Sequence, residues 1–190
     1  MSHSKKDSYL NEATVSSAEV FRGHFLKVQR DQVKLSDESL AVREYITHPG
    51  AAMIIPVLDN GQIVLTKQFR YALKKVFLEF PAGKIDKNED VLETAHRELA
   101  EETGYTTKHM KWLTTIHPVI GYSDERIEIF LATQLVPGAQ KLDPGEMVEV
   151  ENYSLQDLLG MVREQKITDV KTQIGVFWLQ QFLENGWGQN

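Results

Sequence analysis

The chain of 190 residues contains no cysteine. This absence excludes a disulfide framework, a thiolate metal site and a cysteine nucleophile. Long apolar runs are also missing: the longest is the eight residues from Ala51 to Leu58, whereas a membrane-spanning helix needs about 20. The polar N-terminal residues lack the apolar segment of a secretory signal. We therefore expect a cytoplasmic protein that does not bind membranes.

The chain also lacks a surplus of positive charge. The chain has 21 Lys and Arg residues against 27 Asp and Glu residues, and its formal net charge is −6. Nucleic-acid binders gain much of their affinity from cations on phosphates, so nucleic acid is not an expected partner. Glycine-rich phosphate loops of the Rossmann and P-loop types are missing too. The acidity is concentrated in residues 83–105, where seven acidic and three basic side chains give a net charge of −4.

What is present is typical of one folded domain with a modest appendage. The composition is 42% hydrophobic and 25% charged, as in ordinary globular proteins. Residues 1–15 are polar and aperiodic, which predicts a flexible tail. Residues 16–47 carry strand-like patterns around a turn at residues 36–39, which predicts an N-terminal antiparallel β region. Residues 48–190 then form the main domain.

The main domain alternates predicted strands with single helices. Asn60-Gly61 lies between two β-rich runs and predicts a hairpin. The expected strands cover residues 51–58, 62–71, 76–81, 112–117 and 126–132, and the expected helices cover residues 89–103, a segment opened by Ser154, and residues 169–184. This order indicates an α/β or α+β domain with a mixed sheet.

Three carboxylates share one face of the helix predicted at residues 89–103. At 100° per residue, Glu98, Glu101 and Glu102 fall together, beside an apolar stripe that can pack on a sheet. Like charges 5–6 Å apart repel by roughly 3 kcal/mol per pair at an effective dielectric constant near 20. A divalent cation relieves this repulsion, and oxygen ligands favour Mg²⁺, Mn²⁺ or Ca²⁺. A solvated acidic helix face is the alternative interpretation of these residues alone.

The spacing of this segment resembles a known motif. Gly83, Glu89 and the run Arg97-Glu-Leu-x-Glu-Glu-x-Gly104 fill eight positions of the Nudix box. The chain is therefore similar to the Nudix hydrolase superfamily. The resemblance implies an α/β/α sandwich with a mixed sheet. It also implies hydrolysis of a nucleoside diphosphate linked to another group, with Mg²⁺ as the cofactor and Mn²⁺ as a substitute.

The resemblance also implies roles for the residues of the box. Glu98 and Glu102 are the expected main metal ligands, Glu101 is a further ligand with a catalytic role, and the Ala82 carbonyl adds a neutral oxygen. Arg97 is expected to hold the glutamates in position through a pair with Glu89. Gly83 and Gly104 are expected to shape the loop and the helix end.

Motifs outside the box resemble the ADP-ribose pyrophosphatase and nucleoside-diphosphate-sugar hydrolase branch. They include Gln68-Phe-Arg-Tyr71, Leu78-Glu-x-Pro-Ala-Gly83 and Gly121-Tyr-Ser-Asp-Glu125. This branch implies a homodimer in which residues 16–47 reach over the partner. The expected substrate contacts are Arg43, Arg70, Ser123 and Glu125.

The resemblance to this branch also implies a general base in the loop before the last two helices. Glu146 is the best candidate there, and a glutamate of the box is the alternative. Ile120 stands where ADP-ribose-cleaving members commonly have proline, which leaves other nucleotide sugars open as substrates. The rival functions are hydrolysis of nucleoside triphosphates or dinucleoside polyphosphates, and nucleotide-sugar sensing without catalysis.

Overall fold

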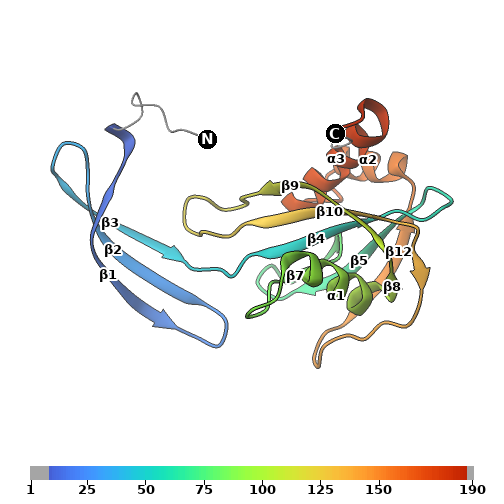
Figure 1. Ribbon diagram of the computed structural model, residues 1–190, viewed down its shortest axis with the longest axis horizontal. Coiled ribbons are helices and arrows are strands. Elements are labelled where there is room, and N and C mark those ends of the chain that lie inside the picture. The colour runs from blue at the N-terminus through green and yellow to red at the C-terminus, as the bar shows by residue number, and fades with distance from the viewer. Residues whose placement is uncertain (1–8, 188–190) are drawn as a thin grey trace. The chain divides into compact units, whose positions relative to one another are not determined.

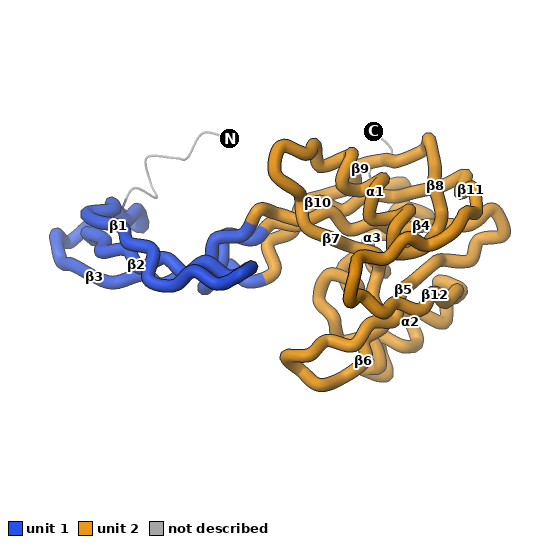
Figure 2. Tube along the Cα trace, turned by 90° about the horizontal axis from the view of Figure 1, so that it is seen from below, with its two compact units in different colours: residues 1–48, 119–125 blue, residues 49–118, 126–190 orange. Residues whose placement is uncertain are grey.

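A computed structural model of the protein describes residues 9–187. The chain forms two compact units (Figure 2). The β unit contains the chain up to His48 together with residues 119–125, and the catalytic-box unit contains residues 49–118 with the chain from Arg126 onward. Residues 1–8 of the expected tail lie outside the described residues, and the first strand begins at Ala13.

The β unit is built on a three-stranded antiparallel sheet in the order β1-β2-β3. The strands are β1 (Ala13–Arg22), β2 (Lys27–Lys34) and β3 (Leu40–Ile46). The predicted turn at residues 36–39 is present, and Leu35 N–H donates to the Ser39 carbonyl at 2.9 Å. All ten residues of β1 are exposed, including Val15, Val20 and Phe21. The sheet of this unit therefore leaves apolar side chains uncovered.

Two larger sheets and three helices form the catalytic-box unit (Figure 1). One sheet has the order β7-β4-β10-β9 and is mixed, because β4 and β10 are parallel while the other pairs are antiparallel. The second sheet is antiparallel, with the order β12-β5-β6. A short pair, β8 with β11, completes the strands of this unit. The bounds are β4 (Ala51–Pro56), β5 (Ile63–Arg70), β6 (Lys75–Glu79), β7 (Ala82–Lys84), β8 (Tyr105–Thr106), β9 (His109–Ile116), β10 (Ile127–Thr133), β11 (Val136–Pro137), β12 (Val148–Tyr153), α1 (Val91–Thr103), α2 (Leu155–Arg163) and α3 (Val170–Asn185).

Alternate side chains of β4 enter two different hydrophobic cores. All six residues of this strand are buried. Met53 and Ile55 join the core formed with α2 and α3, whereas Ala52 and Ile54 join the core formed with α1. Successive strand residues point to opposite faces, so β4 is covered by helices on both sides. This layering confirms the predicted α/β/α sandwich with a mixed sheet and an N-terminal antiparallel β region.

The turn of the predicted hairpin over residues 51–71 is present, but the predicted pairing of its two strands is wrong. Gly61 N–H donates to the Leu58 carbonyl at 2.9 Å, but the only ladder contact between the arms is the isolated bridge between Val57 and Ile63, among the residues that the structure describes. β4 and β5 then diverge into separate sheets, because β4 is paired on both edges by β7 and β10. A turn motif specifies a local reversal, whereas strand pairing depends on the competing partners.

Helix ends follow the local sequence. Asp90 caps α1 in a capping box with Glu93, and Gly104 ends the helix in the left-handed conformation at φ 76°. The predicted cap of the second helix is confirmed, since Ser154 and Asp157 form a capping box. Within residues 9–187, no helix combines the length and the apolar character needed to cross a membrane.

Candidate active site

The carboxylate face of α1 meets the backbone at the start of β7. Glu102 is only 6% exposed, and its Oε2 accepts the Ala82 N–H at 3.2 Å. Glu98 lies directly against Gly83: a Cβ built on this glycine would stand 1.8 Å from Glu98 Oε1. Glycine at position 83 therefore allows the close approach of the helix carboxylate to the strand. Ala82 and Gly83 therefore lie against the carboxylates of α1, a contact that the box spacing alone did not reveal.

Arg97 binds the acidic side chains around it. Its Nε and Nη2 donate to the two oxygens of Glu89 at 2.8 and 2.9 Å. Its Nη1 donates to Glu98 at 2.7 Å and to Glu101 at 3.0 Å, and Nη2 also reaches the Lys84 carbonyl at 3.1 Å. The pair with Glu89 was expected, and the structure adds the contacts with Glu98 and Glu101.

These contacts divide the glutamates into two electrostatic groups. Burial raises the pKa of Glu102 to about 8, and the neighbouring charge of Glu98 adds to the effect. Burial likewise raises the pKa of Glu98, against the effect of Arg97. By contrast, the hydrogen bonds from Arg97 lower the pKa of Glu89 to about 2. Glu89 is thus an ionised partner of Arg97, whereas burial disfavours the ionised forms of Glu98 and Glu102.

The oxygen donors at this place fit a hard divalent cation. Glu102 is buried, Glu98 is half-buried, and both have raised pKa values. The Ala82 N–H contacts Glu102, and Gly83 lies against Glu98. Within residues 9–187, no three acidic, histidine or cysteine side chains converge as a preassembled metal centre. Glu98 and Glu101 are instead both paired with the Arg97 guanidinium.

Two of the other predicted residues approach this cluster. Burial is the largest cause of the raised pKa values of Glu98 and Glu102, and the charge of Glu146 raises both further. Arg70 acts in the opposite direction on Glu102. Its guanidinium is bound by Glu79, with Nε–Oε1 and Nη2–Oε2 distances of 2.7 and 2.8 Å. The catalytic-box unit therefore brings Glu146 and Arg70 into electrostatic contact with the carboxylates of α1.

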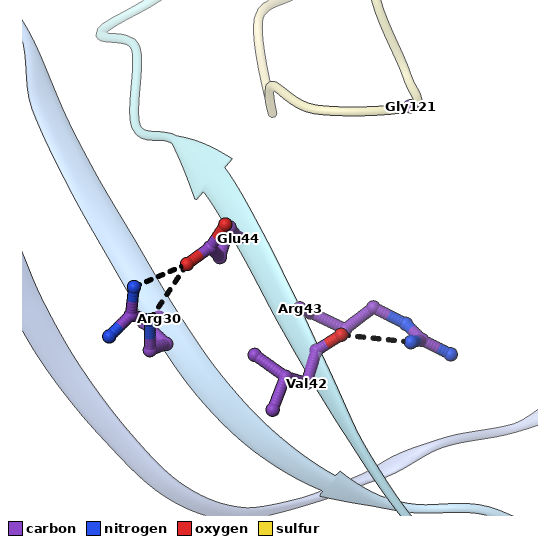
Figure 3. Close-up of a pocket in the computed structure, with 5 residues that line it drawn as sticks. All are labelled: Arg30, Val42, Arg43, Glu44 and Gly121. Carbon is purple, nitrogen blue, oxygen red and sulfur yellow. Dashed lines mark hydrogen bonds and ion pairs between the residues drawn. The ribbon is translucent and has the colours of Figure 1, made fainter.

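The other three predicted substrate contacts lie in the β unit. Arg43 lines a hollow of about 690 Å³, together with Arg30, Glu44 and Gly121 (Figure 3). Arg43 is paired with Glu12, whose carboxylate accepts Arg43 Nε at 2.9 Å, and Arg30 is paired with Glu44 at 2.7 Å. Both arginines are already engaged by carboxylates of the same unit.

Ser123 and Glu125 lie in the loop of residues 119–125, which belongs to the β unit. Ser123 makes a parallel bridge with Ile46, and its Oγ accepts the Glu125 N–H at 3.1 Å. The Glu125 carboxylate lies 3.9 Å from His48 Nε2, and the His48 N–H donates to Asp124 at 2.7 Å. These contacts order the loop within the β unit.

The comparisons with known proteins agree with this geometry. The model of the NUDIX domain matches residues 47–172, which is more than half of the chain. The chain belongs to the Nudix family. It is 37% identical over 173 residues to the ADP-ribose pyrophosphatase of Bacillus subtilis (strain 168), an alignment that covers 90% of this chain and 94% of the relative. It is 38% identical over 171 residues to the methanol dehydrogenase activator of Bacillus methanolicus, covering 89% and 92% of the two chains.

A solved structure described as an ADP compounds hydrolase shares the Nudix fold of this chain. The TM-score is 0.83, the match covers 92% of this chain and 95% of the other, and the identity is 21%. The comparisons thus confirm the family predicted from the Nudix box. They also confirm the resemblance to the ADP-ribose pyrophosphatase branch. The protein is a Nudix hydrolase, a class that generally uses divalent metals.

Sequence reasoning missed one group next to the Nudix box. Glu79 is 3% exposed, and besides Arg70 it binds Lys171 at the start of α3. Glu79 belongs to the motif Leu78-Glu-x-Pro-Ala-Gly83, but the motif alone does not indicate a role for it. No spacing pattern links Lys171 to a residue 92 positions earlier, so only the tertiary structure reveals this contact.

Proposed function

We propose that this Nudix hydrolase cleaves the pyrophosphate bond of ADP-ribose or a related nucleoside diphosphate sugar. The products are a nucleoside monophosphate and a sugar phosphate. The observation that carries the proposal is the pair of half-buried Glu98 and buried Glu102 against the Ala82-Gly83 backbone, where raised pKa values suit cation binding. The 37% identity to an ADP-ribose pyrophosphatase supports the choice of substrate.

Glu98, Glu102, Glu101 and the Ala82 carbonyl are the proposed holders of Mg²⁺, with Mn²⁺ as a substitute. When bound, the cation neutralises pyrophosphate oxygens and polarises the attacking water. Arg97 keeps Glu98 and Glu101 in reach through its hydrogen bonds.

Glu146 is proposed as the general base that takes the proton of the attacking water. It lies on the segment between β11 and β12, and its charge acts on both buried glutamates. Glu101 remains the alternative base, because its side chain is 30% exposed and faces the same cluster through Arg97.

Substrate contacts are proposed for Arg70, Arg43, Ser123 and Glu125. Arg70 is bound to Glu79 yet keeps 44% of its side chain exposed, so part of its guanidinium can meet an anion. The other three belong to the β unit, where Arg43 and Ser123 flank ordered backbone.

A homodimer through residues 16–47 is part of the proposal. The uncovered apolar side chains of β1 and β3, among them Val20, Phe21 and Val42, support it because such surface favours association. Sedimentation velocity should give twice the chain mass of 21.7 kDa. A monomer at micromolar concentration would contradict the dimer and leave the hydrolytic proposal standing.

A substrate panel tests the activity. ADP-ribose, GDP-mannose, UDP-glucose, NADH, nucleoside triphosphates and dinucleoside polyphosphates are assayed with Mg²⁺ and with Mn²⁺, and products are separated by chromatography. We expect AMP and ribose phosphate from ADP-ribose. Release of inorganic pyrophosphate from triphosphates as the main reaction would favour a triphosphatase instead. Binding without turnover on any substrate would favour a sensor.

The variant Glu102→Gln ties turnover to the site. We expect turnover to fall by orders of magnitude while circular dichroism stays native. The matched control is Glu149→Gln, because the Glu149 side chain is 79% exposed and its ion-pair partner is Lys67 at 3.6 Å. Activity that survives Glu102→Gln would refute the ligand assignment.

The likeness to a methanol dehydrogenase activator favours a second candidate function. In it, the chain stimulates a methanol dehydrogenase. Addition of the protein to a methanol dehydrogenase, with Glu102→Gln as the control, tests it. Stimulation by the wild-type chain, but not by the Glu102→Gln variant, would support this function. The cytoplasmic location and the exclusion of nucleic acid as a partner stay predictions.

A further inference from the structure

Four charged side chains form an ion-pair cluster at the N-terminus of α3. This α3 cluster consists of Arg70, Glu79, Asp169 and Lys171. Glu79 takes two hydrogen bonds from Arg70 and one from Lys171, whose Nζ also lies 2.9 Å from Asp169 Oδ2. Two cations face two carboxylates, so the cluster is neutral as a whole.

Burial makes the α3 cluster sensitive to the loss of any member. The Glu79 side chain is 4% exposed, and those of Lys171 and Asp169 are 12% and 19% exposed. Burial alone would raise the pKa of Glu79, but the contacts with Arg70 and Lys171 outweigh it and hold the pKa below its ordinary value. Removing Lys171 leaves two carboxylates with one cation between them, and a buried charge without its partner is strongly unfavourable.

A hydrogen bond connects the same end of α3 to Phe80, the residue that follows Glu79. Thr172 is fully buried, and its Oγ1 accepts the Phe80 N–H at 3.1 Å. The same hydroxyl donates to the N-cap carboxylate of Asp169 at 2.6 Å. Lys171 and Thr172 therefore hold two consecutive residues, Glu79 by its side chain and Phe80 by its backbone.

These two residues carry the chain from one sheet to the other. Glu79 ends β6 in the antiparallel sheet, and Ala82 begins β7 in the mixed sheet. Only Phe80 and Pro81 span the crossing, and the Ala82 N–H then meets Glu102 on α1. Ala82 itself pairs with Met53 on β4. With so few residues before it, its place depends also on where Glu79 and Phe80 are held.

We propose that Lys171 and Thr172 are positioning residues for the active site. By holding Glu79 and Phe80, they set the backbone of Ala82 against Glu102, and with it the carbonyl oxygen offered to the cation. The inference rests on the proposed function for the role of that carbonyl. Neither residue contacts substrate, and both act through the crossing between β6 and β7.

The test uses paired variants of the full chain. Lys171→Met removes the charge and Lys171→Arg keeps it. Thr172→Val removes the hydroxyl at nearly constant shape and Thr172→Ser keeps it. Lys67→Met is the control, because Lys67 forms comparable ion pairs with Glu149 and Glu151 on β12. The measurements are Mn²⁺ affinity from the electron paramagnetic resonance signal of free Mn²⁺, hydrogen exchange of the Ala82 amide in the metal-free protein, and kcat with KM on ADP-ribose.

We expect Lys171→Met and Thr172→Val to weaken Mn²⁺ binding by about tenfold or more, as observed when residues supporting metal ligands are changed. The Ala82 amide should exchange faster, and kcat should fall more than KM rises. Lys171→Arg and Thr172→Ser should recover most of the affinity, and Lys67→Met should leave it unchanged.

A purely structural role predicts a different result. Variants that lower the thermal midpoint, yet bind Mn²⁺ and protect the Ala82 amide like the wild type below that midpoint, would overturn the inference. If Lys171→Met does not fold, the Thr172→Val and Thr172→Ser pair decides. If the wild type binds no Mn²⁺, the proposed function fails, and Ala82 exchange alone then supports or overturns the positioning role.

Discussion

The raised pKa of Glu102 predicts that the ionised form of this side chain destabilises the metal-free protein. The pKa is about 8 in the folded state against a reference value of 4.5. Between these values the folded state binds more protons than the unfolded state, so the free energy of unfolding contributed by Glu102 falls as pH rises. From pH 5 to pH 8 the loss amounts to about 3 kcal/mol, at 1.36 kcal/mol per pKa unit.

Glu102→Gln removes this titration and keeps an oxygen for the Ala82 N–H. The variant should therefore gain stability relative to the wild type as pH rises, by about 3 kcal/mol between pH 5 and pH 8, or about 6–12 °C in thermal midpoint for a chain of this size. The assay is urea and thermal unfolding with a chelator present, followed by circular dichroism, with Glu149→Gln as the control. Parallel stability curves of variant and wild type across this pH range would refute the reasoning. Added Mn²⁺ should reverse the order, because it stabilises only the chain that keeps the carboxylate.

Three further predictions address the remaining groups of the site. Glu146→Gln should lower kcat by about 10²–10⁴-fold with little change in Mn²⁺ affinity, because a general base contributes on this scale, and an unchanged pH–rate profile would speak against it. Gly83→Ala should displace the Glu98 carboxylate, since the new Cβ would stand 1.8 Å from Oε1, and calorimetry should show weakened Mn²⁺ binding. Arg97→Met should raise the midpoint of acid unfolding. The depressed pKa of Glu89, about 2, supplies stability above pH 4.5 that is lost as pH falls toward 2, and circular dichroism from pH 5 to pH 2 measures it.

Local sequence predicted the features that depend on near neighbours. The end of α1 at Gly104 and the capping box at Ser154 are set by residues within four positions of the helix ends. The carboxylate face of α1 follows in the same way from helical periodicity. The Nudix box therefore identified the family before any tertiary contact was known.

Pairing between distant strands could not be predicted in this way. The Asn60-Gly61 turn is present, yet β4 and β5 separate into two sheets because β10 and β7 occupy the edges of β4. A residue pattern shows which faces of a strand are apolar, but it does not show which strand lies beside it.

The amino-acid sequence by itself determined the acidic helix face and the family, because both depend on residues at fixed short spacing, and the family resemblance implied the layered fold. Only the tertiary structure decided how these parts act together. Burial in the folded chain raises the pKa of Glu102 to about 8. Folding also pairs Arg97 with three carboxylates and Lys171 with Glu79. Burial and long-range ion pairs depend on which segments pack together, and that packing arises from the whole chain.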